Sequence, residues 1–263
     1  MEKIKKQFPT GTKEWATSNV NLISGCSHNC RYCYAKKMAI RFGRKTDSTW
    51  KEMEVNKYKI NQRFKKRKGR VMFPSSHDIV PEYKEECFLV LERLLEAGNS
   101  VLITSKPHYN VIKELCDKFV YFRKQIQFRF TITSINNNSL KFWEENAPTF
   151  EERLESLKYA YFMKYRTSVS IEPFLDKNPN PLIIKLYTFV SDTIWIGKMN
   201  YIDRQNITSK EKIFYNSIRN NFSKKNIQAI INKLINCRKI RYKDSIKRMD
   251  VKIPIFQAPC VKI

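Results

Sequence analysis

Three cysteines, Cys26, Cys30 and Cys33, lie within eight residues in the spacing C-x3-C-x2-C. Tyr32 directly precedes the third of them. Three thiolates on one short loop can bind three irons of a cubane [4Fe–4S] cluster and leave the fourth iron open to an external molecule. The spacing therefore predicts a cluster at which chemistry on a bound molecule can start.

The same cysteines could instead hold a structural zinc ion, with His28, Cys237 or Cys260 as a further ligand. Zinc sites usually combine one close pair of ligands with a second pair at some distance in the sequence. Here three cysteines lie close together and the sequence holds no second C-x-x-C. The pattern favours the cluster, and zinc is the alternative.

The cysteine run with its aromatic residue resembles the signature of the radical S-adenosylmethionine (radical SAM) superfamily. In that family the open iron binds the amino and carboxylate groups of SAM. An electron from the cluster then cleaves SAM to methionine and a 5′-deoxyadenosyl radical, which abstracts hydrogen from a substrate. The resemblance implies that the three cysteines hold the cluster, that Tyr32 packs near the adenine, and that an external donor supplies the electron.

The bulk composition indicates a folded, cytosolic protein. Its 263 residues are 42% hydrophobic, enough for a large core. The amino terminus lacks the apolar stretch of a secretory signal, and no apolar run reaches the roughly 20 residues that span a bilayer. In a reducing compartment, cysteines are expected to be ligands or buried thiols, and Cys87 and Cys116 fall on helical faces.

The formal net charge is +25, which favours a polyanionic partner such as nucleic acid. An AT-rich genome, indicated by the many Ile and Asn residues, would also raise the Lys content everywhere. Residues 57–70 hold eight cations, no acid, and the aromatic residues Tyr58 and Phe64. Residues 201–263 hold 15 cations and 4 acids. We predict that both segments contact nucleic acid, with a solvated basic face as the alternative.

Short apolar runs alternate with longer helical patterns, which is typical of βα units around a parallel sheet. Strands are predicted over 20–24, 70–74, 100–105, 127–133, 166–173 and 193–197, and helices over 82–97, 110–119 and from the capping box at Thr149 to about residue 163. Six strands predict a partial TIM barrel, (β/α)6, over residues 1–200. Radical SAM cores are of this kind, so the resemblance implies the same fold.

The remaining residues, 201–263, are predicted to form a basic C-terminal helical extension that packs on the barrel. Helices are expected over about 209–219 and 224–237, followed by a terminal strand over 251–256.

In such barrels the reactive residues follow the carboxyl ends of the strands. The polar stretches 74–78, 103–107, 131–135 and 170–173 stand at these positions. Together with residues 144–153, they resemble the spore photoproduct lyase-like branch of the radical SAM proteins over about residues 18–200.

That resemblance implies a set of residues around SAM, which supplies an ammonium, a carboxylate and a diol. They are Tyr32, Ser75, Ser76, Asp78, Ser105, Lys106, Thr133, Ser134 and Arg153. The residues after the second strand would lie near the amino and ribose groups, and those after the third and fourth near the carboxylate and ribose. Arg153 would pair with the carboxylate. Ordinary turns, and a surface pair of Arg153 with Glu145 or Glu152, are the alternatives.

The sequence departs from spore photoproduct lyase at one functional position. That enzyme uses a cysteine close to the second strand to quench its substrate radical, whereas the turn here holds Ser75, Ser76 and His77. Repair of thymine dimers is therefore not predicted. His77 and His108 could serve acid–base steps or phosphate contacts, although neutral turn histidines are favoured. Cys260 is a candidate hydrogen-atom donor, with a free surface cysteine favoured.

The leading hypothesis is thus a radical SAM enzyme that acts on DNA or RNA, in modification or repair. A radical SAM enzyme acting on a protein, peptide or small metabolite is the first alternative. A non-catalytic, zinc-containing nucleic-acid-binding protein is the second.

Overall fold

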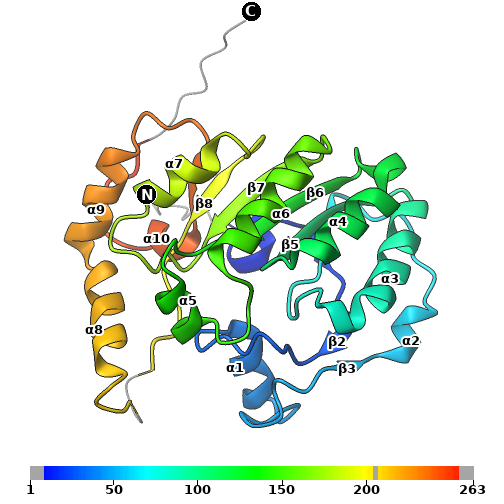
Figure 1. The fold of residues 1–263 in the computed structure, drawn as a ribbon, viewed down its shortest axis with the longest axis horizontal. Coiled ribbons are helices and arrows are strands. Elements are labelled where there is room, and N and C mark those ends of the chain that lie inside the picture. The colour runs from blue at the N-terminus through cyan, green and yellow to red at the C-terminus, as the bar shows by residue number, and fades with distance from the viewer. Residues whose placement is uncertain (1–8, 204–206, 255–263) are drawn as a thin grey trace, which may run out of the picture.

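The computed structural model describes residues 9–203 and 207–254. Its centre is one sheet of parallel strands, drawn in Figure 1, in the order β1-β4-β5-β6-β7-β8-β9. The strands are β1 (Ser18–Asn19), β4 (Arg70–Phe73), β5 (Ser100–Ser105), β6 (Ile126–Thr131), β7 (Arg166–Ile171), β8 (Ile194–Ile196) and β9 (Ile240–Tyr242). Within the described residues the two edge strands, β1 and β9, do not pair with each other, so the barrel is not closed. The predicted α/β partial barrel is confirmed, with seven strands where six were predicted.

Helices cover the outer face of the sheet, as Figure 1 shows for α3, α4 and α6. The helices between the strands are α3 (Lys84–Glu96), α4 (Tyr109–Lys118), α5 (Asn137–Trp143), α6 (Phe150–Phe162) and α7 (Asn180–Tyr187), with short 3-10 turns η2 (Pro81–Tyr83) and η3 (Val120–Phe122). The predicted capping box opens α6, where the Thr149 side chain accepts a hydrogen bond from the Glu152 N–H. The apolar face of α3 is buried against the sheet, and Gly98 follows the helix with a φ of +75°.

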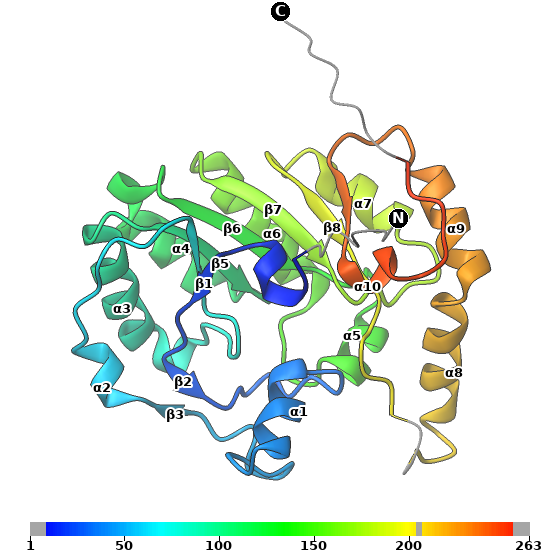
Figure 2. The same ribbon diagram turned by 180° about the vertical axis from the view of Figure 1, so that it is seen from behind.

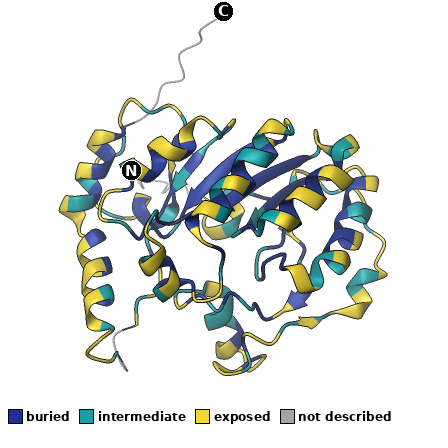
Figure 3. Ribbon diagram, in the orientation of Figure 1, coloured by how far each residue is buried: buried dark blue, intermediate teal, exposed yellow. Residues whose placement is uncertain are grey.

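The inner face of the sheet is covered by the amino-terminal segment, seen in Figure 2. The 3-10 turn η1 (Gly11–Glu14) leads into Trp15 and Ala16, which pack against Met72 of β4 and Leu102 of β5. The strands are therefore buried on both faces, as Figure 3 shows. This explains why β4 to β7 are near-continuous buried runs rather than alternating ones.

The first predicted strand, over 20–24, is wrong in its position. The strand of the main sheet is β1, and the residues after it leave the sheet. Ile23–Ser24 form β2, which pairs antiparallel with β3 (Glu54–Val55). Val20 keeps one link to the barrel, because its N–H donates to the Met72 carbonyl at 2.9 Å. The chain thus turns away from the sheet before the cysteines.

The carboxyl-terminal segment adds a strand as well as helices. It contains α8 (Lys212–Asn221), α9 (Lys224–Lys233), β9 and α10 (Asp244–Lys247). The strand predicted over 251–256 is wrong for residues 251–254, which form no strand, and residues 255 and 256 lie outside the described ranges. Instead β9 pairs with β8 and extends the main sheet. The division into a core to residue 200 and an extension stays a prediction.

No helix in the described ranges is long and apolar enough to cross a membrane.

Candidate active site

The three motif cysteines line one cavity of about 770 Å³ at the carboxyl edge of the sheet. Cys26 and Cys30 are buried and Cys33 is half-buried. Cys33 is the N-cap of α1 (Tyr34–Arg41), where its sulfur accepts a hydrogen bond from the Lys36 N–H at 3.4 Å. The Cys26 N–H donates to the Trp50 carbonyl at 3.0 Å. The loop is therefore held at both ends by backbone contacts, and its thiols share one cavity.

Gly25 is required by the close approach of the backbone before the first cysteine. Its φ is +94°, in the region that side chains rarely adopt. A Cβ at this position would lie 2.3 Å from the Glu52 carbonyl oxygen and 2.8 Å from that of Trp50. Only glycine fits, so the approach angle of the cysteine loop depends on this residue.

The donor set fits an iron–sulfur cluster. Burial raises the pKa of the Cys26 thiol well above its ordinary value and that of the Cys30 thiol to about 12. Binding of metal must therefore displace protons from these thiols. Beside them the indole N–H of Trp50, which also lines the cavity, has no hydrogen-bond partner among the described residues. An unpaired donor next to three thiols suits a group that carries sulfide acceptors.

Cys237, one of the further zinc ligands suggested by the sequence, lies apart from the motif cysteines. Within residues 9–203 and 207–254, no group of three or more His, Cys, Asp or Glu side chains could hold a metal ion. Cys237 packs against the main core, whereas Cys26 and Cys33 belong to a separate small cluster around Trp50. A cubane cluster spreads its cysteine ligands over separate corners, so it does not need the tight grouping that one ion needs.

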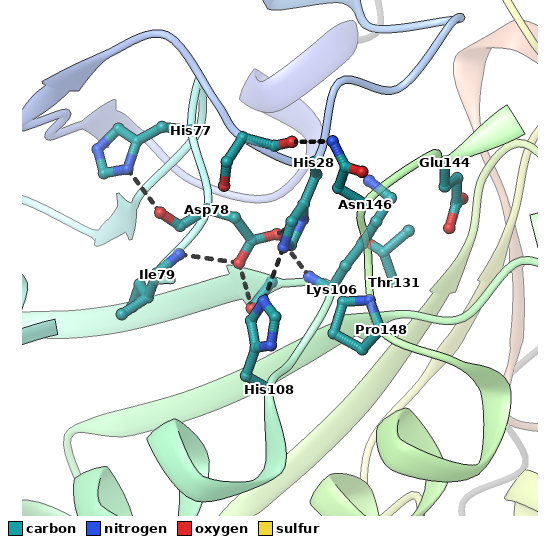
Figure 4. A network of polar contacts seen from close by, with 12 residues as sticks. His28, His77, Asp78, Ile79, Lys106, His108, Thr131, Glu144, Asn146 and Pro148 are labelled. Atoms are coloured by element: carbon teal, nitrogen blue, oxygen red, sulfur yellow. Dashed lines mark hydrogen bonds and ion pairs between the residues drawn. The ribbon is translucent and has the colours of Figure 1, made fainter. Parts of the chain in front are cut away.

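Asp78 ties the ends of β4 and β5 to the cysteine loop (Figure 4). Its carboxylate accepts hydrogen bonds from the Ser105 hydroxyl, the Lys106 N–H at 2.7 Å and the Ile79 N–H at 2.9 Å. The ring Nδ1 of His28 lies 3.3 Å from its Oδ2. Burial alone would raise the pKa of Asp78, but His28, Lys106 and Ser105 outweigh it and the pKa is lowered. The carboxylate is therefore ionised and already well supplied with donors.

The histidines near Asp78 are engaged within the protein. The Nε2 atoms of His28 and His108 lie 3.0 Å apart, so at most one of them carries a proton in this contact. His77 accepts a hydrogen bond from the Leu22 N–H at Nε2, and its Nδ1 lies 3.0 Å from the Asp78 carbonyl oxygen. Burial lowers the pKa of His77 to about 4. The neutral turn histidine favoured from the sequence is therefore what the contacts of His77 support.

The predicted serines after β4 form a turn built on Asn21. The Asn21 Oδ1 accepts from the Ser75 N–H at 2.6 Å and the Ser76 N–H at 3.0 Å. Both serines line the cavity together with Asp78, Ser105 and Lys106. Together with Tyr32, these make six predicted SAM-binding residues that line the cavity with the cysteines.

The buried carboxylate of Glu144 connects three of the other predicted residues. Tyr32 lines the cavity, and its hydroxyl donates to Glu144. Glu144 also accepts from the Thr133 hydroxyl at 2.8 Å and pairs with Arg153 at 2.5 Å. Thr133 and Arg153 are fully buried and do not line the cavity. Ser134 is buried as well and donates to Asp176 at 2.5 Å.

Lys106 occupies the space between these two groups. Its Nζ lies 5.6 Å from the centroid of the Tyr32 ring. Burial alone would lower the pKa of Lys106, but Cys30, Glu144 and Asp78 outweigh it and the pKa is raised. A fixed cation therefore faces the cavity beside the cysteine loop.

Several residues that line the cavity after β7 and β8 and around α10 are not among the predicted site residues. They include Glu172 after β7, Lys198 after β8, and Lys243 and Arg248 around α10. Glu172 stands in the polar stretch 170–173 after a predicted strand, which is the signal that could have found it. The carboxyl-terminal residues carried no such signal, because β9 was not predicted.

Among the described residues, no cysteine outside the motif lines this cavity. Cys87 and Cys116 are fully buried on α3 and α4, as predicted. Cys260, the candidate hydrogen donor, lies outside the described residues.

Comparison with known proteins gives three kinds of match. The sequence profile of the Radical SAM superfamily matches residues 20–177. The uncharacterized protein ORF301 of Acidianus two-tailed virus is 27% identical over 176 residues, which cover 62% of this chain and 57% of that protein. Among solved structures, spore photoproduct lyase complexed with dinucleoside spore photoproduct matches with a TM-score of 0.49 and 15% identity, over 76% of this chain and 60% of that one. Methylornithine synthase (PylB) matches with a TM-score of 0.44 and 10% identity, over 94% of this chain and 77% of that one.

Proposed function

Because the chain belongs to the radical SAM superfamily, whose members use a [4Fe–4S] cluster and SAM, we propose that it is an enzyme that abstracts hydrogen from a nucleic-acid substrate. When bound, the reduced cluster supplies the electron that cleaves SAM to methionine and a 5′-deoxyadenosyl radical. An external donor must provide that electron.

One observation carries the proposal. The three motif cysteines and the polar residues after β4 and β5 line a single cavity at the carboxyl edge of a partial barrel. This is the edge at which barrels of parallel strands place their reactive groups. A volume of about 770 Å³ lies within the usual range for small-molecule and cofactor sites.

In this proposal, different residues around the cavity bind the cluster and SAM. Cys26, Cys30 and Cys33 hold the cluster and leave one iron for SAM. Lys106 attracts the carboxylate of SAM, and the Ser76 hydroxyl contacts its polar groups. These roles use the cation and the short hydroxyl that face the cavity.

In this proposal Arg153 does not contact SAM directly. Its guanidinium is fully buried and is paired with Glu144, which in turn accepts from the Tyr32 hydroxyl. We assign Arg153 and Thr133 to the positioning of Tyr32 through Glu144. Asp78 likewise positions the cysteine loop through His28 and the strand ends through Ser105.

Nucleic acid is the proposed substrate because of charge. The chain carries +25, and Lys13, Lys198, Lys243 and Arg248 line the cavity in addition to Lys106. Phosphate groups are drawn to such a concentration of cations. A protein, peptide or small metabolite is the alternative substrate.

The reaction class is tested by anaerobic incubation of the reconstituted protein with SAM and dithionite. We expect 5′-deoxyadenosine to accumulate with the wild-type protein and not with Cys30→Ala. A protein that contains zinc but no iron, and shows no absorbance near 400 nm after reconstitution, would instead support the non-catalytic alternative.

The substrate class is tested by deuterium transfer. DNA and RNA deuterated in the sugar and base are supplied separately, and deuterium is sought in the 5′-deoxyadenosine. Transfer from one of them identifies the substrate. Robust formation of 5′-deoxyadenosine without transfer from either would turn the search to peptides and metabolites.

A further inference from the structure

Glu172 is a half-buried carboxyl that lines the cavity and has no hydrogen-bond partner among the described residues. It follows β7 at the carboxyl edge of the sheet and lines the cavity, with its side chain 17% exposed. Within the described ranges, its carboxylate accepts no hydrogen bond. Its oxygens are not among the fully buried, unpaired side-chain atoms of the described residues, so they are open to a ligand that enters the cavity.

The nearest cation does not satisfy this carboxyl. The Nζ of Lys243 lies 3.9 Å from Glu172 Oε2 but 2.6 Å from Glu14 Oε2. The same Nζ donates to the Gly11 carbonyl at 2.9 Å and lies 4.1 Å from the centroid of the Trp15 ring. Lys243 is therefore occupied by Glu14 and the amino-terminal turn. Glu172 keeps lone pairs that nothing in the described protein uses.

The fold leaves space for the Glu172 carboxyl on its other side. Gly197 follows β8, and a Cβ there would lie 2.7 Å from Glu172 Cγ and 2.9 Å from Oε1. Any side chain at residue 197 would push the carboxyl away. The close contact with glycine thus holds Glu172 against one wall, where it faces the cavity.

The position of Glu172 separates it from the side of the cavity assigned to SAM. His28 of the cysteine loop contacts Asp78 after β4, and Asp78 in turn accepts a hydrogen bond from Ser105 of β5. Glu172 ends β7, beyond β6 in the order of the sheet, and its neighbours come from η1 and α10. A ligand group that reaches Glu172 therefore lies on the β7 side of the cavity, whereas Lys106 follows β5.

We propose that Glu172 anchors the substrate by accepting a hydrogen bond from one of its N–H or O–H groups. This inference rests on the proposed radical chemistry in the same cavity. For a nucleic acid, the donor is an amino or imino group on a nucleobase edge or a sugar hydroxyl, and Lys198 and Arg248 on the same wall face its phosphates. Burial raises the pKa of Glu172 to about 7. A hydrogen-bond donor on a bound ligand would favour the ionised carboxylate and lower this pKa.

The first test compares Glu172→Met and Glu172→Gln with the wild type and with Glu155→Gln, a matched change on the exposed surface of α6. Met has the same unbranched shape without polar atoms, so it removes the unpaired group without filling the space beside Gly197. We expect the melting temperatures of both Glu172 variants to equal or exceed that of the wild type. We also expect their affinity for SAM to stay within about twofold, since Glu172 is outside the SAM side.

The second test measures 5′-deoxyadenosine formed with SAM and dithionite, without and with a mixed-sequence single-stranded DNA or RNA 20-mer. We expect the oligonucleotide-dependent increase to fall by about 10-fold or more in Glu172→Met, from the loss of one hydrogen bond to a charged group. The rate without oligonucleotide should stay unchanged. The Glu155→Gln protein should behave as the wild type in both conditions.

The inference is overturned if Glu172→Met keeps the oligonucleotide-dependent increase of the wild type, and by either of two further results. A melting temperature lowered by about 5 °C or more in both Glu172 variants would make the residue structural. A loss of SAM affinity of about 10-fold would assign it to the cofactor. If the wild type responds to neither oligonucleotide, the nucleic-acid proposal fails by itself.

Discussion

Arg153 and Glu144 form an ion pair, with 2.5 Å between Nη2 and Oε2, in which neither side chain is exposed. Glu144 also accepts from the Tyr32 hydroxyl, so the pair connects α6 to the residue that precedes the third motif cysteine. Burial alone would raise the pKa of Glu144, but Arg153 and Lys106 outweigh it and the pKa is lowered. The pair is therefore charged and supports the cysteine loop from behind.

Breaking this pair should strongly destabilise the fold. Arg153→Met leaves the Glu144 carboxylate buried without its main partner, and such a loss costs about 3–5 kcal/mol. Unfolding in urea, followed by circular dichroism, measures the change. Lys158→Gln, which breaks an exposed pair with Glu155 on the same helix, should change stability far less. Equal effects of the two substitutions would contradict the supporting role of the buried pair.

Iron content should depend on the motif cysteines alone. Cys30→Ala removes one of three cluster ligands, so iron per chain and absorbance near 400 nm should fall to near background after anaerobic reconstitution. Cys237→Ala is the matched control, since this half-buried thiol packs on the main core. It should leave iron unchanged. A loss of bound zinc in Cys237→Ala would revive the zinc alternative.

Gly25→Ala should block assembly of the site. The added methyl would lie 2.3 Å from the Glu52 carbonyl, so the loop must shift. We expect iron incorporation to fall severalfold, by the same assay. At Gly43, with a φ of +63°, a Cβ meets nothing within 4 Å. Gly43→Ala therefore carries only backbone strain, and iron content close to wild type is expected. A larger loss of iron in Gly43→Ala than in Gly25→Ala would mean that the close contact of Gly25 with the Glu52 carbonyl is not required for the site.

Stability should carry a pH-dependent contribution from Glu172. Burial raises its pKa from 4.5 to about 7, with Lys243 opposing the shift and Asp244 and Glu14 adding to it. Between these values the folded state holds a proton that the unfolded state has lost, so this contribution to stability decreases as the pH rises. Melting temperatures of wild type and Glu172→Gln are measured from pH 5 to 8. The melting temperature of Glu172→Gln should rise relative to that of the wild type as the pH increases. A difference in melting temperature that stays constant from pH 5 to 8 would contradict the raised pKa of Glu172.

Binding of nucleic acid should weaken steeply with salt if the cavity wall contacts phosphates. Fluorescence anisotropy with a labelled single-stranded DNA 20-mer gives the slope of log affinity against log salt. Arg248→Gln removes a cation that lines the cavity and should lower both affinity and slope.

Lys65→Gln with Lys66→Gln tests the predicted basic segment 57–70. That part of the segment packs near the turn before β5, where the Asn99 side chain donates to the Lys65 carbonyl. A larger effect of the lysine pair would move the interface to that segment.

Local patterns in the sequence were sufficient for much of the fold. The strands β4 to β7 lie within about two residues of their predicted positions. Continuous apolar residues form the centres of β4 and β5, and apolar residues alternate with polar ones along β6. The capping box at Thr149 placed the start of α6 for a similarly local reason. The cysteine spacing also indicated the family, because three thiolates on one short loop can bind three irons of one cluster.

The tertiary structure alone decided which polar residues face the cavity. Arg153 is adjacent in sequence to Glu152 and pairs instead with Glu144, because α6 turns its side chain inward. Glu14 and Lys243 come from opposite ends of the chain and meet at 2.6 Å. A strand of three residues, β9, brings the second of them there, and its pattern is too short to recognise. Spacing along the chain encodes contacts within a loop or a helix, whereas contacts between distant segments exist only once the sheet has set their order.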